Sequence, residues 1–245
     1  MMKKLFMMCF IFCCACTKED PLTISDPSLE LKYDSKHLFT VKKGAQTLSN
    51  SLIDWKVSDT KIGTIDYDGN FKGRKIGKTD VIAYTNEGTV KASVEITPYT
   101  NMYTEPSVDF KKSAQAIKSM EKRKIKSEDN EYIFYAGENS KVQYVIYHFT
   151  NNQLESSLVI LTTTKAVVNE LADFIHERYP VSGVFQGLAV ALDDNKNYCI
   201  FMDVDDSLGL VAMYLPYTPN KREKPDPDYL KNILKSYKEA MRAKK

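Results

Sequence analysis

The alternation of apolar and polar residues divides the chain into two segments with different periods. Between residues 21 and 98, short alternating runs predict seven β-strands, at 28–31, 38–41, 52–57, 62–65, 70–74, 80–84 and 90–96. Gly44, Gly69 and Gly77 fall between these runs, where tight connections need a positive φ angle. The segment has no helical period, so the pattern predicts an all-β sandwich of two packed sheets.

From residue 107 onward the pattern contains both helical and strand periods. It predicts helices at 107–122, at 165–179 and from 226 onward, and strands at 132–136, 142–149, 154–162, 184–192, 198–204 and 210–215. A helix followed by three strands thus occurs twice, which indicates a doubled α-β-β-β unit. Runs of consecutive strands favour an antiparallel sheet, and we expect the helices to pack on one face of it. This segment is therefore predicted to be an α+β domain.

Two prolines mark the boundary between the segments. Pro98 and Pro106 enclose a polar stretch, and proline interrupts both strand pairing and helices. We therefore expect a β domain at 21–98, a linker at 99–106 and an α+β domain at 107–245, each domain being long enough to fold around its own core.

The first twenty residues have the pattern of an export signal. Two lysines precede an apolar run of about eleven residues, which is too short for a membrane-spanning helix of roughly twenty. Ala15 and Cys16 end this run, and the segment resembles the signal of bacterial lipoproteins. The resemblance implies cleavage of the signal peptide at 1–15, acylation of Cys16 and a lipidated tether at 16–20. An ordinary secretory signal cut at another position is the alternative.

The residues after Cys16 bear on the location. Lys18, Glu19 and Asp20 are similar to the signal that sends some Gram-negative lipoproteins to the outer face of the outer membrane. This similarity implies a protein anchored by lipid in the cell outer membrane and facing the outside.

The balance of basic and acidic residues limits which classes of partner the protein is expected to bind. The chain has 34 Lys and Arg against 32 Asp and Glu, and two of the lysines lie in the predicted signal, so the mature chain has no net formal charge. Nucleic-acid binding normally requires a basic face, so we expect no nucleic acid as partner. The expected partners are the membrane, through the lipid, and an unidentified protein or glycan. Cys199 is the one cysteine after Cys16, so no intramolecular disulfide is expected.

Short segments between residues 55 and 83 keep the order and spacing of a known bacterial domain. They are WKVSD (55–59), IGTID (62–66), GNFKG (69–73), GKT (77–79) and VIA (81–83). Together they resemble the bacterial immunoglobulin-like domain, group 2. The resemblance implies that Trp55 is a core residue and that Gly69 forms a hairpin turn. The family occurs in bacterial surface proteins including adhesins, so it implies either an adhesion module or a spacer that lifts the next domain off the membrane.

The α+β segment contains a possible binding surface. The strand at 142–149 is apolar on both faces, and tyrosines recur on it and on the strand before it. We predict that Tyr132, Tyr135, Tyr144 and Tyr147 form a binding surface, because tyrosine combines a large ring with a polar tip and is enriched at interfaces. The alternative is a central strand that is covered on both faces, with the tyrosines in the core.

Catalytic and metal-binding motifs are not evident. The chain lacks Gly-x-Ser-x-Gly, His-Glu-x-x-His and a phosphate-binding loop, and the acidic run that ends at Gly209 has its glycine one place late for a calcium loop. We therefore expect no catalytic residue, metal or cofactor, and we favour a binding or cell-adhesion protein with an immunoglobulin-like stalk and an α+β head. An envelope enzyme, favoured by a deep cleft with converging acids, and an accessory subunit of an outer-membrane complex remain as alternatives.

Overall fold

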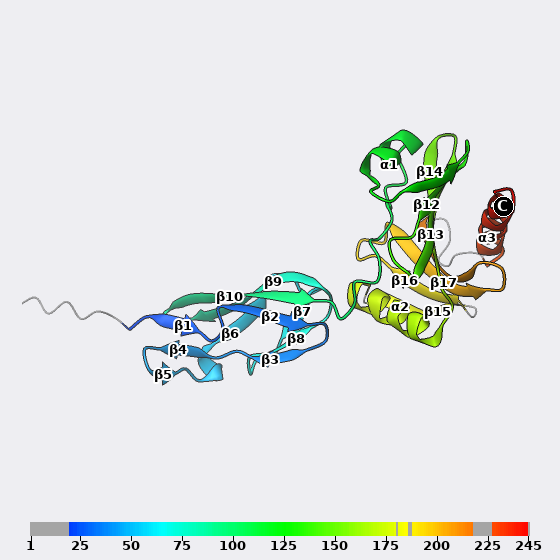
Figure 1. The fold of residues 1–245 in the computed structure, drawn as a ribbon. Helices are drawn as coiled ribbons and strands as arrows, with labels where there is room; N and C mark the ends of the chain where they lie inside the picture. Colours follow the sequence, from blue (N-terminus) through cyan, green and yellow to red (C-terminus); the bar gives the residue numbers. More distant parts are fainter. Residues whose placement is uncertain (1–19, 180, 186–187, 218–226, 245) are drawn as a thin grey trace, which may run out of the picture.

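The computed structural model describes residues 20–179, 181–185, 188–217 and 227–244. Figure 1 shows an elongated β domain followed by a domain of strands and helices, here called the head. The predicted signal peptide at 1–15 and the acylation site Cys16 lie outside the described residues. Within the described ranges, no helix is both long enough and apolar enough to cross a membrane.

The β domain consists of ten strands and one turn of 3-10 helix. They are β1 (Leu22–Ile24), β2 (Ser28–Lys32), β3 (Lys36–Leu38), β4 (Val41–Lys43), β5 (Gln46–Thr47), η1 (Asn50–Leu52), β6 (Asp54–Val57), β7 (Gly63–Ile65), β8 (Asn70–Gly73), β9 (Gly77–Thr85) and β10 (Gly88–Thr97). A four-stranded sheet has the order β2-β10-β9-β6, and two three-stranded sheets have the orders β1-β4-β5 and β3-β8-β7. Side chains from all three sheets, including Val41, Trp55, Phe71 and Val94, meet in one core. The predicted sandwich is confirmed, and the structure buries Trp55 as the resemblance implies.

One predicted strand of this domain is divided in two. The run 38–41 is interrupted at Phe39 and Thr40, whose backbone N–H groups donate to the carbonyl oxygen of Gly69 at 2.9 Å and to Oγ of Ser25 at 3.0 Å. Because these bonds replace strand pairing, the chain leaves the sheet of β3 and enters that of β4 at this point. The strands β1 and β5 were not predicted, since two or three residues are too few to show an alternation.

In the described ranges, the head contains eight strands and three helices. They are α1 (Ala114–Met120), β11 (Ile125–Glu128), β12 (Tyr132–Ala136), β13 (Val142–Thr150), β14 (Gln153–Leu161), α2 (Lys165–Arg178), β15 (Val181–Phe185), β16 (Leu188–Leu192), β17 (Tyr198–Asp205), β18 (Gly209–Pro216) and α3 (Pro227–Arg242). The strands form one antiparallel sheet in the order β11-β12-β13-β14-β18-β17-β16-β15. One helix and four consecutive strands therefore occur twice, and β14 pairs with β18 where the halves meet. The doubled unit is present, but each half has four strands and not three. In the first half β11 was not predicted, and in the second half the predicted strand 184–192 corresponds to two strands, β15 and β16.

Helices cover both faces of this sheet, and the prediction that they pack on one face is wrong. One core contains Ile117 of α1 and Phe174 of α2, together with one set of alternating strand residues. The other core contains Leu230 and Tyr237 of α3 with the opposite set. Figure 1 shows α2 and α3 on different sides of the strands. The helix α3 follows the second repeat and covers the face of the sheet opposite to α1 and α2.

The first helix is shorter than predicted. The sequence pattern places it at 107–122, whereas α1 spans Ala114–Met120. Ser107 is instead held against the sheet, because its N–H donates to the Tyr147 hydroxyl at 3.1 Å and its carbonyl oxygen accepts from the Ser157 hydroxyl at 2.9 Å. Ser113 caps the helix by accepting a hydrogen bond from the N–H of Ala116.

The stretch predicted as a linker packs against the head. Met102 and Tyr103 are 2% and 5% exposed and belong to the same core as α2. The ring of Tyr103 lies 4.5 Å from that of Phe174. Residues 99–106 are therefore packed into the head and are not a free connection between the domains.

Candidate functional site

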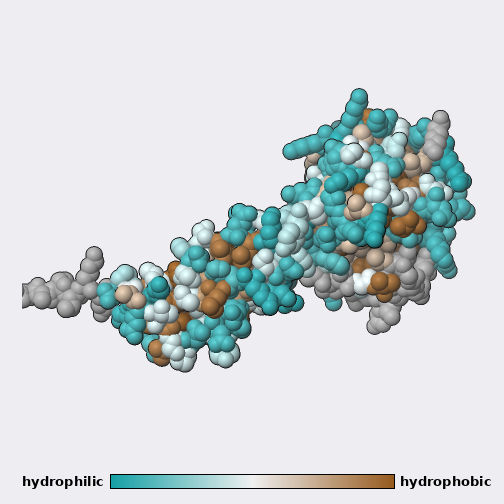
Figure 2. All heavy atoms as spheres, turned by 60° about the horizontal axis from the view of Figure 1, so that its bottom comes forward, coloured by the Kyte–Doolittle hydropathy of each residue, from teal (hydrophilic) through white to brown (hydrophobic). Residues whose placement is uncertain are grey.

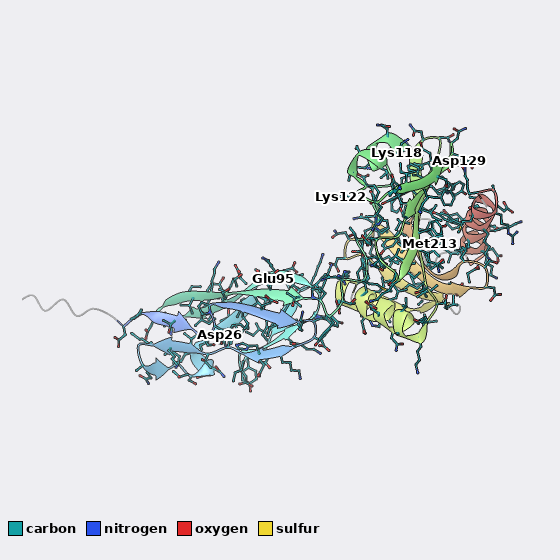
Figure 3. The ribbon with its side chains drawn as sticks, in the orientation of Figure 1. Asp26, Glu95, Lys118, Lys122, Asp129 and Met213 are labelled. Carbon is teal, nitrogen blue, oxygen red and sulfur yellow. The ribbon has the colours of Figure 1, made fainter. Side chains whose placement is uncertain are left out.

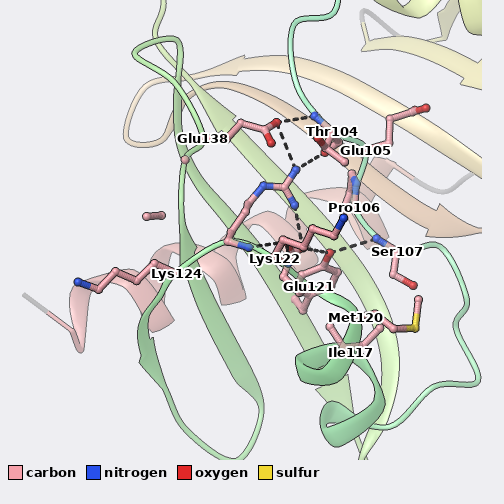
Figure 4. A pocket seen from close by; sticks show the side chains of 14 residues that line it. Thr104, Glu105, Pro106, Ser107, Ile117, Met120, Glu121, Lys122, Lys124 and Glu138 are labelled. Atoms are coloured by element: carbon pink, nitrogen blue, oxygen red, sulfur yellow. Dashed lines mark hydrogen bonds and ion pairs between the residues drawn. The ribbon is translucent and has the colours of Figure 1, made fainter.

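A cleft lies beside α1 and is formed by segments that are distant in the sequence. Its volume is about 630 Å³, and its walls are residues 104–107, the end of α1 with residues 121–124 after it, and the β12–β13 turn at 136–138 (Figure 4). The turn approaches the next strand so closely that a Cβ atom on Gly137 would lie 1.6 Å from the carbonyl oxygen of Val142. A side chain at this position would therefore displace the wall of the cleft.

Arg123 lies between two acidic residues of this cleft. Its side chain is 5% exposed, and its Nη1 lies 2.7 Å from Oε2 of Glu121. Its Nη2 lies 3.4 Å from Oε1 of Glu138 and also donates to the carbonyl oxygen of Thr104. The buried Nε has no hydrogen-bond partner among the described residues. Because this nitrogen is buried, it is not a donor that the cleft presents to solvent.

The carboxylate of Glu121 is held by several hydrogen bonds. Its Oε1 accepts from the backbone N–H groups of Lys122 and Arg123, and its Oε2 accepts from the Tyr147 hydroxyl at 2.7 Å. Burial raises the pKa of the Glu121 carboxyl, but the bonds from Tyr147 and Arg123 lower it more, so the net pKa is below its ordinary value. Glu121 is therefore ionised at neutral pH.

A third acidic residue of the cleft is bound to the tyrosines of the head. Oε1 of Glu105 accepts hydrogen bonds from the hydroxyls of Tyr179 at 2.5 Å and Tyr214 at 3.1 Å. Tyr103 and Tyr198 extend this network through hydroxyl contacts of 2.9 Å and 3.1 Å. Burial is the main cause of a raised pKa for all four tyrosines, which keeps their hydroxyls protonated. The network fastens residues 103–105 to the sheet.

Two lysines at the cleft differ from the acidic residues in having no ion-pair partner among the described residues. Lys122 and Lys124 line the cleft and are exposed, and neither forms an ion pair within the described part of the chain. Figure 3 shows Lys122 and Lys118 at the α1 end of the head. Met120, which is 54% exposed, and Pro106 add an apolar wall. The cleft therefore combines free cationic donors with an apolar side.

The four tyrosines of the predicted binding surface do not lie together on an exposed face. Tyr135 and Tyr147 are 1% exposed on the side of α2, whereas Tyr132 is 6% exposed on the side of α3, and half-buried Tyr144 packs on that same side. On the face that Figure 2 shows, apolar residues form small groups separated by hydrophilic ones. Tyr147 alone among the four borders the cleft.

Apart from Tyr147, the residues of the cleft were not predicted from the sequence. The run of one acidic and three basic residues from Glu121 to Lys124 is an available signal, but such runs usually lie on solvated surfaces. No group of three or more His, Cys, Asp or Glu side chains in the described ranges is arranged to hold a metal ion.

The comparisons with known proteins support the assignment of the first domain. Residues 20–96 match the family model of the bacterial Ig-like domain (group 2). The first domain is an Ig-like domain of this group. The head matches no family model, and no curated protein matches the chain.

Two solved structures are similar to the chain over most of its length. Domains 5–6 of the S-layer protein SbsC share 12% sequence identity with a TM-score of 0.28, and the alignment covers 83% of this chain and 86% of that one. Domains 4–9 of the surface layer protein SbsC share 11% identity with a TM-score of 0.29, over 83% of this chain and 28% of that one. The chain thus spans about a quarter of the second structure. At TM-scores this low, the similarity gives no evidence about function.

Proposed function

We propose that the protein is a lipid-anchored binding protein of the cell envelope, in which the Ig-like domain is a stalk and the head carries the ligand site. The observation that carries the proposal is the arrangement in Figure 1, where the described chain begins at one end of the sandwich and the head lies at the other. The strand β10 has ten residues and leads toward the head. At about 3.3 Å per residue it spans roughly 30 Å, so the stalk would hold the head well away from the lipid surface.

Direct contacts between stalk and head support this arrangement. The backbone N–H of Ile76 donates to the carbonyl oxygen of Glu177 in α2 at 2.9 Å, and Lys75 forms an ion pair with Asp194. The carboxylate of Glu177, a residue that is 1% exposed, accepts from the N–H of Tyr99 at 2.8 Å. These contacts join α2 both to the stalk and to the segment that leaves it, which limits bending at the junction.

The cleft beside α1 is the proposed ligand site. Its three carboxylates accept hydrogen bonds from the protein itself, as described for Glu105, Glu121 and Glu138. A catalytic acid or base needs a carboxyl that can reach the substrate's proton. The engaged state of these carboxylates favours binding over acid–base catalysis.

Substitution of the predicted acylation site tests the anchor. We expect Cys16→Ser to move the protein from the membrane fraction to the soluble extracytoplasmic fraction, because the lipid would no longer be attached. Cys199→Ser is the matched control, since Cys199 is a buried free thiol of the head. The readout is partitioning between detergent and aqueous phases, and a Cys16→Ser protein that stays in the detergent phase would overturn the anchor.

The released protein also tests the binding function. Added to isolated cell envelopes, the Cys16→Ser protein should sediment with them in a saturable manner through its head. A protein that stays in the supernatant at all concentrations would contradict a binding role.

A further inference from the structure

We propose that β15 pairs with β15 of a second copy of this chain, so that two heads join through the free edges of their sheets. The two strands would run antiparallel about a two-fold axis at Gly183, and Ser182 of each copy would lie opposite Val184 of the other. This surface is separate from the cleft beside α1, and the inference goes beyond the proposed ligand binding.

The first argument is that β15 is an edge strand without the usual protection. It pairs with β16 in a register without a bulge, and no described strand pairs with its other side. Edge strands present unpaired N–H and C=O groups, and proteins commonly block them with charged side chains, proline or bulges. The sequence of β15, VSGVF, contains no charged residue. Each other edge strand of four or more residues in the described ranges has at least two, which are Glu30 and Lys32 in β2, Asp54 and Lys56 in β6, and Lys126 and Glu128 in β11.

The second argument is that no described element covers the two faces of β15. Side chains of successive residues point to opposite faces of a sheet. Val184 is 78% exposed, the highest fraction among the large apolar side chains that the structure describes. A Cβ atom added at the neighbouring Gly183 would meet no described atom within 4 Å. The strand, which lies away from α1 in Figure 1, therefore offers an apolar surface together with free backbone groups.

The third argument is that β15 is complementary to itself. In an antiparallel pair of identical strands, one contact satisfies the free edges of both copies. With the two-fold axis at Gly183, Val181 lies opposite Phe185 of the other copy, and apolar cross-strand pairs of this kind stabilise sheets. No like charges meet across the pair, because β15 has none.

Two other occupants fit the edge less well. Within this chain, the longest undescribed stretch after the predicted signal, 218–226, has the sequence TPNKREKPD. Its two prolines and five charged residues are unsuited to pairing with an apolar strand. The opposite edge of a second head, β11, has Lys126, Glu128 and a register shift between Ile125 and Ser127. Open head-to-tail chains of copies are thus disfavoured, and the contact closes as a dimer.

Sedimentation of the full mature chain with Cys16→Ser, in solution without detergent, tests the pairing in the absence of lipid. Two five-residue strands bury less surface than a standard interface, so the dimer should be weak, and the measurement covers roughly 10 µM to 1 mM. We expect the average mass to rise with concentration toward twice that of one chain. A chain that stays monomeric throughout this range would overturn the inference and leave the edge to a different protein.

Charges placed across the pair test its register. Ser182→Lys/Val184→Lys places like charges directly opposite each other and should weaken self-association about tenfold. Ser182→Glu/Val184→Glu should do the same. An equal mixture of the two variants should form a mixed dimer, since each lysine then faces a glutamate. Recovery in the mixture would also show that both variants are folded, and a mixture that stays monomeric would contradict the proposed register.

Two further variants separate edge pairing from general effects of charge or unfolding. Ile125→Lys/Ser127→Lys adds the same two charges to β11, the opposite edge strand, and should leave the association unchanged. Val184→Lys alone changes a mostly exposed side chain, so it should keep the thermal unfolding of the parent and still weaken the dimer. Equal association of Val184→Lys and the parent, or an equal loss in the β11 variant, would show that β15 is not the contact. These results do not depend on acylation of Cys16 or on the cleft, so the proposed function is tested separately.

Discussion

Trp55 shows how one residue organises the stalk. Its side chain is 6% exposed in β6, and its indole nitrogen has no hydrogen-bond partner within the described part of the chain. The indole lies against Gly69, where an added Cβ would be 3.2 Å from the ring and 2.5 Å from the carbonyl oxygen of Phe39. Gly69 also has a φ angle of 86°, which favours glycine. The turn and the tryptophan therefore depend on each other.

A large-to-small substitution at Trp55 should unfold the stalk. We expect Trp55→Ala to lower the free energy of unfolding of the Ig-like domain by about 3–5 kcal/mol, since it leaves a cavity in the core. Urea denaturation followed by circular dichroism should show an unfolded stalk and a nearly unchanged helical signal from the head. Tyr67→Ala is a suitable control, because Tyr67 is 77% exposed. A Trp55→Ala protein as stable as the parent would refute the core role.

At the scale of elements, α3 covers the second face of the sheet of the head. Tyr237 of α3 is fully buried, and its hydroxyl lies 2.8 Å from Oγ of buried Ser156. The His148 ring stacks on Tyr132 with a centroid distance of 4.5 Å and lies 6.0 Å from the ring of Tyr237. The helix thus covers a histidine that has little contact with water.

Acidification should weaken the packing of α3. Burial lowers the pKa of His148 below its ordinary value, although Glu155, Glu131 and Asp129 oppose this by favouring the charged ring. The unfolded chain therefore binds more protons than the folded one between the folded pKa and the ordinary value of about 6.5, so stability falls as pH decreases through this window. Thermal unfolding followed at pH values from above 7 down to 5 measures the loss. His148→Gln should reduce this slope, and an unchanged slope would exclude His148 as its cause.

At the scale of the whole molecule, stalk and head have separate cores that meet at a small junction. The core around Trp55 contains stalk residues, and both cores of the head contain residues from 102 onward. A loop of the stalk contacts α2 and the β16–β17 turn through Ile76 and Lys75. The segment after the stalk belongs to the head, since the Tyr99 N–H bonds to Glu177.

The head should therefore fold without the stalk if its own segment is kept. We expect the fragment 99–245 to unfold in one cooperative transition, because it retains Met102, Tyr103 and the bond from Tyr99 to Glu177. A fragment that starts at residue 107 is the matched comparison and should be less stable, since it lacks two buried core residues and Glu105. Calorimetry measures both, and a fragment 99–245 without a cooperative transition would show that the stalk completes the head.

Local patterns determined much of this protein. The strands at 132–136 and 198–204 and the helix at 165–179 were predicted within one or two residues, because alternation and helical periodicity arise from residues close in the sequence. The same holds for the order of segments around Trp55, from which the Ig-like domain was predicted and then confirmed by the family model. A buried tryptophan and a hairpin glycine leave a local signal.

Tertiary structure alone determined which face of the sheet each helix covers and which segments form the cleft. The pattern of α3 shows that it has an apolar face but not which side of the sheet it covers, so the helices were placed on one side. The burial of Tyr135 depends on α2 and that of Tyr132 on α3, which are distant in the sequence. The cleft brings together residues 104–107, 121–124 and 136–138, and Arg123 is buried there because Glu121 and Glu138 approach it from different segments. Such contacts depend on packing between distant parts of the chain, and periodicity carries no information about them.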